Sequence, residues 1–160
     1  MTGVEAFLKQ LDHAWKHKWE SLEAALHDVT EEEATWQARC YRKVEREEGW
    51  PPPGTIRWQV AHIAHCKRHY TDFIKAPGSS ERPPVPERKP TATFAEDRVE
   101  LAEAHGAQRD AIASLSDSDL ELPVGNGMPL GEFLAMAIRH DTWHAAQITV
   151  ARRLWRARPS

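Results

Sequence analysis

Apolar residues recur every three or four positions along four long stretches of this chain. That spacing places them on one face of an α-helix. We therefore predict helices over residues 2–26, 55–75, 93–115 and 130–155, and no strand. Four amphipathic helices bury their apolar faces most simply by packing together. The predicted fold class is all-α, a single-domain four-helix bundle spanning residues 1–160.

Proline-rich segments separate the first three of these helices. The sequence GWPPPGT at residues 49–55 cannot continue a helix, because its prolines lack backbone N–H donors. Thr55 is then the predicted N-cap of the second helix. Residues 76–90 form a second proline-rich loop, which could cover a cleft or only connect two helices. Residues 30–33 (TEEE) are typical of a capping box that opens a short turn carrying Trp36.

Composition excludes several classes of protein. The formal net charge of −3 and a single short basic cluster at the C-terminus do not favour binding to nucleic acid. No apolar run approaches the roughly 18 residues that a membrane span needs, and no secretory leader is recognisable. We therefore expect a cytoplasmic protein. The counts of nine histidines and seven tryptophans are unusual. They point to a metal, and to a ligand-lined cleft or an interface.

The fourth predicted helix carries two histidines on its apolar face. His140 and His144 share one sector of the helix with Phe133 and Ala137. A buried imidazole with an unpaired donor or acceptor costs about 1–3 kcal/mol. The spacing of four residues lets both rings reach one cation. The alternative is two separately hydrogen-bonded core histidines. Gln147, one turn further on the same face, could orient a ligand or a water.

The second predicted helix offers the third ligand. Its candidates are His62, His65 and His69. His62 lies at the edge of the apolar face and is preferred, His69 is the alternative, and His65 is expected to be solvated. Trp58 and Trp143 could line a cleft beside these histidines, although a core or interface position suits either tryptophan better.

Two other residues have more than one interpretation. Cys66 is expected to be a small buried side chain, and a role as metal ligand or reactive thiol is less favoured. His105 lies on the apolar face of the third predicted helix. We expect a core histidine there, with a metal ligand or a partner of one as the alternative.

A site of three neutral imidazoles without a carboxylate suits several divalent cations. Zinc or nickel is most favoured, and iron or manganese is also compatible. Such a site leaves coordination positions for water or substrate. Neither HxxxH segment carries the glutamate of a zinc-protease helix, and the paired Glu-x-x-His motifs of a di-iron bundle are missing.

Three segments together resemble the DinB-like, or YfiT-like, superfamily. They are TEEE followed by Trp36, WxxxHI at residues 58–63, and HxxxHxxQI at residues 140–148. The similarity of helix order and length covers nearly the whole chain. Ala146 stands where members of the family often have glycine.

The resemblance implies a four-helix bundle, often a homodimer, with a divalent metal held by three histidines at one end of a central cleft. By motif position these ligands are His62, His140 and His144. Family members of known activity are metal-dependent thiol enzymes, among them bacillithiol and glutathione S-transferases and a mycothiol-dependent maleylpyruvate isomerase. We therefore expect a thiol S-transferase that acts on a low-molecular-weight thiol and a small electrophile. A non-catalytic metal-binding protein and a purely structural bundle are the alternatives.

Overall fold

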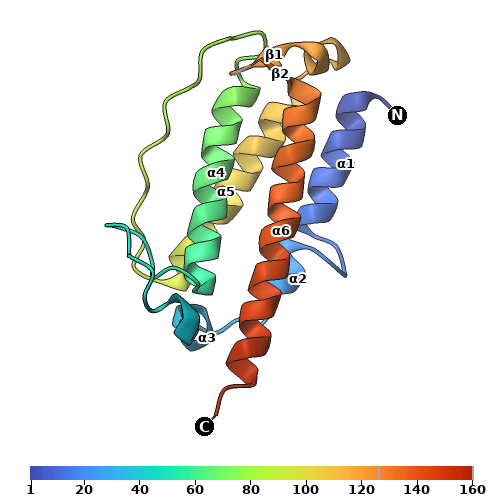
Figure 1. The fold of residues 1–160 in the computed structure, drawn as a ribbon. Helices are drawn as coiled ribbons and strands as arrows, with labels where there is room; N and C mark the ends of the chain where they lie inside the picture. Colours follow the sequence, from blue (N-terminus) through green and yellow to red (C-terminus); the bar gives the residue numbers. More distant parts are fainter. Residues whose placement is uncertain (126, 160) are drawn as a thin grey trace.

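The computed structural model describes residues 1–125 and 127–159. Four long helices run side by side (Figure 1): α1 (Gly3–Trp15), α4 (Ile56–Ile74), α5 (Phe94–Ala113) and α6 (Leu130–Arg156). Helices α1 and α4 each pack against both α5 and α6, which closes the bundle. The predicted all-α four-helix bundle is confirmed.

Short elements fill the connections. They are α2 (Leu22–Leu26), α3 (Glu31–Thr35), the 3₁₀ turns η1 (Arg39–Tyr41) and η2 (Asp117–Glu121), and the strands β1 (Pro123–Val124) and β2 (Met128–Pro129). The two strands pair antiparallel between α5 and α6. The prediction of no strand was wrong, because two-residue strands are too short to show an alternating pattern. Gly125, which follows β1, and Gly127, which precedes β2, both have positive φ, a conformation that glycine adopts without strain.

The first predicted helix, over residues 2–26, is interrupted. Helix α1 ends at Trp15 and α2 begins at Leu22. Ser21 caps α2, since its hydroxyl accepts from the Ala24 N–H at 3.2 Å. Trp15 and Leu22 are seven residues apart, which is two helical turns. The apolar pattern therefore continues across the break and hides it in the sequence.

Threonine side chains cap α3, α4 and α5, whereas α6 begins at Leu130 without a side-chain cap. Thr55 caps α4, and its hydroxyl accepts from the Trp58 N–H at 3.0 Å. Thr93 caps α5 with a complete capping box. Thr30 caps α3, but the predicted box is incomplete. The Glu33 carboxylate instead accepts from Arg152 Nε of α6 at 2.9 Å.

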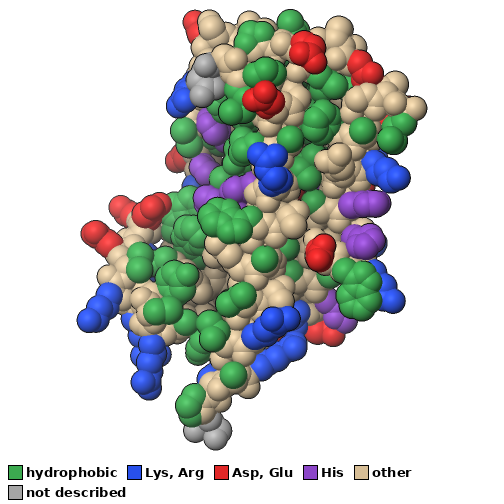
Figure 2. Space-filling model, turned by 45° about the vertical axis from the view of Figure 1, so that its right-hand side comes forward, with side chains coloured by type: hydrophobic (Ala, Val, Ile, Leu, Met, Phe, Trp, Pro, Cys, Tyr) green, Lys and Arg blue, Asp and Glu red, His purple; other side chains and the backbone are tan. Residues whose placement is uncertain are grey.

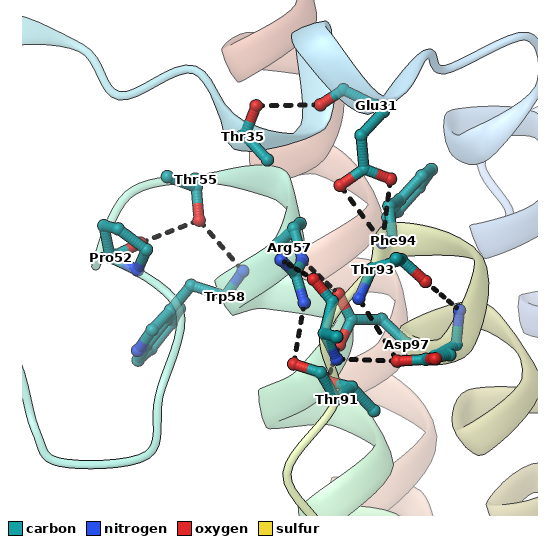
Figure 3. A network of polar contacts seen from close by, with 12 residues as sticks. Glu31, Thr35, Pro52, Thr55, Arg57, Trp58, Thr91, Thr93, Phe94 and Asp97 are labelled. Atoms are coloured by element: carbon teal, nitrogen blue, oxygen red, sulfur yellow. Dashed lines mark hydrogen bonds and ion pairs between the residues drawn. The ribbon is translucent and has the colours of Figure 1, made fainter.

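A polar network ties the starts of α3, α4 and α5 together (Figure 3). Arg57 Nε donates to Asp97 Oδ2 at 2.6 Å, and its terminal nitrogens donate to the carbonyls of Thr91 and Ala92. The Phe94 N–H donates to Glu31 at 2.9 Å. These contacts hold the first turns of α4 in a defined position relative to its neighbours.

A buried polar layer divides the apolar core into two clusters. One cluster includes Ile56, Val60, Ile63, Leu101, Ala145 and Ile148; the other includes Leu11, Ile74, Ala111, Ile112, Leu130 and Leu134. Between the two clusters, each of three helices contributes one polar side chain that is about 1% exposed: Lys67 of α4, Gln108 of α5 and Asp141 of α6. Lys67 Nζ donates to Gln108 Oε1 at 2.9 Å and to Asp141 Oδ2. Lys67 thus links the Gln108 amide and the Asp141 carboxylate inside the bundle, whereas Asp141 Oδ1 has no hydrogen-bond partner among the described residues.

Helix α6 is the longest helix, and its C-terminal turns extend past the end of the bundle (Figure 1). Its apolar face is interrupted midway by His140, Asp141 and His144. Across residues 1–125 and 127–159, no helix has an apolar stretch long enough to cross a bilayer.

Candidate metal centre

Helices α4 and α6 bring three histidines and one cysteine close together. His62 and Cys66 lie one turn apart on α4, as do His140 and His144 on α6. His140 Nε2 lies 3.3 Å from His62 Nε2 and 3.1 Å from His144 Nε2. Cys66 Sγ lies 3.5 Å from His62 Nε2. The ligand atoms of His62, Cys66 and His140 all lie within 4.8 Å of one another.

These separations fit a shared divalent cation. Two imidazole nitrogens bound to a tetrahedral zinc at about 2.1 Å would lie about 3.4 Å apart. The observed distances from His140 Nε2 to the other two ring nitrogens, 3.3 and 3.1 Å, are close to that value. The group whose ligand atoms all lie within 4.8 Å of one another comprises His62, Cys66 and His140, and it could hold a metal; His144 is not part of that group but contacts His140.

A glutamine orients His144. Gln59, one turn before His62 on α4, accepts a hydrogen bond at its Oε1 from His144 Nδ1. An amide oxygen only accepts, so the Nδ1 atom carries the hydrogen and the Nε2 lone pair faces His140. Partners of this kind commonly fix the orientation of metal-binding histidines. Sequence reasoning did not identify Gln59, although it precedes His62 by three residues and so shares its helix face.

Burial keeps the imidazoles neutral, which is the form that binds metals. Burial and the neighbouring His62 lower the pKa of His140 to about 4. Burial, His140 and His62 lower the pKa of His144 to about 3, and a hydrogen bond with Gln147 opposes part of that shift. Burial also lowers the pKa of His62. All three rings can offer a lone pair at neutral pH.

Cys66 does not occupy the core position expected for it. The side chain is half-buried, faces the histidines and belongs to neither apolar cluster of the described residues. Burial raises the pKa of its thiol to about 11. The spacing of four residues from His62 equals that between His140 and His144, so this signal was present in the sequence.

The remaining histidines of the bundle lie elsewhere. His69 packs edge-on against Phe73. His65 is half-buried against Trp50, so the prediction of a solvated side chain was wrong. His105 is buried and stacks on Trp15 with ring centroids 4.1 Å apart, as expected for a core histidine.

Tryptophans flank the histidines on two sides. Trp58 stacks on His62, with ring centroids 5.0 Å apart and an angle of 6° between the planes. Trp143 lies 5.2 Å from the His144 ring and is 61% exposed. Trp58 limits the rotation of the His62 ring, whereas Trp143 lies at the surface.

A cavity of about 360 Å³ lies beside His144. Its lining is mostly apolar and comprises Trp36, Ala38, Cys40, Tyr41, Gly54, Gln59, Trp143, Ala146, Gln147, Val150, Ala151 and Leu154. Gln59 both lines this cavity and contacts His144, so it connects the two. Figure 2 shows histidine side chains reaching the surface next to large hydrophobic side chains. The volume suits a small organic molecule.

The buried polar layer is formed by residues next to the candidate ligands in the sequence. Asp141 follows His140 in the sequence, and Lys67 follows Cys66. Sequence reasoning missed Lys67, Asp141 and Gln108. The sequence pattern that could have revealed them is a polar residue within the apolar face of each of three helices, such as Lys67 between Ile63 and Ile74.

Comparison with known proteins agrees with this architecture. The family model described as the DinB superfamily matches residues 14–148. No curated protein and no solved structure gives a significant match. The matched region contains all four long helices in whole or in part, and all four candidate ligands. The chain therefore belongs to the DinB superfamily.

Proposed function

We propose that His62, His140 and His144 hold one divalent cation, zinc or nickel by preference, and that the protein is a thiol S-transferase. The observation that supports the metal site is the convergence of three neutral imidazole nitrogens between α4 and α6. Gln59 accepts from His144 Nδ1, so the Nε2 lone pair of that ring is available to a metal.

Thiol transfer needs a thiolate held near an electrophile. A divalent cation with an open coordination position lowers the pKa of a bound thiol. The half-buried His62 and His140 leave the centre within reach of the surface. Gln147 lines the adjacent cavity and can orient a polar group of a bound molecule.

The cavity beside His144 suggests the second substrate. Its apolar walls would take up a small, largely apolar electrophile, and Gln59 and Gln147 supply the polar contacts. Trp143 forms part of this wall. The low-molecular-weight thiol would bind at the metal and the electrophile in the cavity, and Gln59 connects the two places because it lines the cavity and contacts His144.

The test of the metal site is elemental analysis of protein purified without an affinity tag. Wild type should carry about one divalent metal ion per chain, and His144→Ala should lose it. His27→Ala is the matched control, because His27 is exposed and pairs with its neighbour Asp28. A wild-type protein that neither contains nor takes up zinc or nickel would exclude the metal site.

A non-catalytic metal-binding protein is the second candidate. The closeness of Cys66 to His62 favours it, since a fourth protein ligand would close the coordination shell. Metal-loaded protein should be assayed with bacillithiol, mycothiol and glutathione against a small aromatic electrophile. Turnover that is lost in His144→Ala supports the transferase, and stoichiometric metal without turnover supports the second candidate.

A further inference from the structure

We propose that Cys66 is a fourth protein ligand of the metal, so that three imidazoles and one thiolate hold the ion in the resting protein. This inference rests on the metal site proposed above, but not on thiol transfer. It assigns a function to a side chain that the three-histidine pattern leaves unused.

The geometry supports a direct bond to the ion. A zinc ion with a nitrogen at about 2.1 Å and a sulfur at about 2.3 Å in tetrahedral geometry holds them about 3.6 Å apart. Cys66 Sγ lies 3.5 Å from His62 Nε2. The Cys66 sulfur also lies within 4.8 Å of the His140 ligand atom. All of these atoms belong to side chains on the facing sides of α4 and α6.

The local helix geometry keeps the sulfur in place. Residues four apart on a helix lie above one another, so Cys66 points the same way as His62. The chain's other cysteine, Cys40, is exposed on η1 and belongs to no such group among the residues that the structure describes. Cys66 is thus the cysteine that the fold directs toward the candidate centre.

A bound thiolate changes both the charge and the access of the centre. A free thiol is mostly protonated at neutral pH, so binding releases one proton as the bond from sulfur to metal forms. Three imidazoles and one thiolate fill the four positions of a tetrahedral ion. An external thiol would have to replace Cys66, and the proton that it loses would pass to the released Cys66 sulfur.

Cobalt(II) provides a direct test, because thiolate ligands give it a sulfur-to-metal charge-transfer band in the near ultraviolet. Metal-free full-length protein is titrated with cobalt(II) as wild type, Cys66→Ser and Cys40→Ser. We expect the band in wild type and Cys40→Ser and its loss in Cys66→Ser. The loss should be accompanied by about one fewer proton released per bound ion.

The outcomes separate this inference from the proposed metal site. Wild-type protein that binds cobalt without the band overturns the role of Cys66 and leaves the three-histidine site intact. A band that survives in Cys66→Ser overturns it too. Protein that binds no cobalt overturns both proposals.

A second measurement removes the dependence on a folded variant. Wild-type protein, with and without one equivalent of zinc, is treated with iodoacetamide, and each cysteine is quantified by mass spectrometry. Zinc should protect Cys66 at least about tenfold and leave Cys40 unchanged, because only the thiolate free of metal reacts. Cys66 that is labelled measurably without zinc and to the same extent with zinc bound contradicts the inference.

Discussion

Replacing Lys67 with methionine tests whether the polar layer of the bundle is as buried as its contacts indicate. The side chains of Lys67 and Asp141 are each about 1% exposed and pair directly. Lys67 Nζ also donates to Gln108 Oε1 at 2.9 Å. Lys67→Met preserves the length of the aliphatic chain and removes the charge. Asp141 then remains in the core without a cation.

The expected loss of stability is large. Removing one partner of a buried ion pair costs about 3–5 kcal/mol, because the other charge stays desolvated. Total stabilities of domains are about 5–15 kcal/mol, so this loss is a substantial fraction. With a urea m-value of about 2 kcal/mol/M, the unfolding midpoint should fall by roughly 2 M.

The pH dependence of the loss gives a second signature. Burial raises the pKa of Asp141, and Lys67 opposes that rise in the wild type. Without Lys67 the folded-state pKa rises further above the unfolded value, so the variant favours the protonated acid. A raised carboxyl pKa contributes stability that is present at low pH and is lost as the pH rises. The gap between wild type and Lys67→Met should therefore be wider at pH 7 than at pH 5.

Two controls complete the experiment. The double variant Lys67→Met/Asp141→Leu should recover most of the loss, since an apolar pair of similar volume often replaces a buried ion pair without cost. Lys16→Met removes an exposed lysine 3.8 Å from Glu23 and should change stability by less than about 0.5 kcal/mol. A loss below about 1 kcal/mol for Lys67→Met would refute the buried pair.

Three further predictions concern acid stability, metal affinity and assembly. Burial lowers the pKa of His105 to about 3, below its unfolded value, so its contribution to stability is lost as the pH falls from about 6.5. Wild type should therefore lose free energy of unfolding between pH 7 and pH 5, and His105→Phe should lose less, by on the order of 1 kcal/mol. Urea unfolding of both proteins at the two pH values measures this, and equal losses would contradict it. Gln59→Leu removes the partner of His144 and should weaken zinc binding about 10- to 100-fold by isothermal titration calorimetry, whereas an unchanged affinity would show that Gln59 orients nothing. We also propose a homodimer through the exposed apolar side chains of α6, among them Val150 at 53% exposure; Val150→Glu should give monomers in light scattering, and a wild-type monomer would exclude the dimer.

Much of the fold could be predicted from short-range patterns. The helix starts at Thr55 and Thr93 follow from side-chain caps within three residues, and the apolar period shows which face of each helix is buried. The same local reasoning placed His140 and His144 on one face of α6. This reasoning missed the break between Trp15 and Leu22, because the apolar residues on its two sides keep the helical spacing.

The composition of the candidate centre depended on the packing of distant segments. Residues 62 and 140 are 78 positions apart, and whether their rings meet depends on how α4 and α6 rotate about their axes. That rotation results from the packing of the two apolar clusters. A pattern of neighbouring residues in the sequence does not show how distant helices pack. The periodicity of the second helix alone could not decide between His62 and His69, and the family resemblance was needed to choose.

The sequence by itself determined the helical bundle, its caps and the pairs of side chains one turn apart. Only the tertiary structure brought Gln59 to His144, turned Cys66 toward the histidines and joined Lys67, Gln108 and Asp141 across three helices. The physical reason is range. Helix period and capping act over three or four residues, whereas a polar group in the core is stable only when packing brings its partner from another helix within hydrogen-bonding distance.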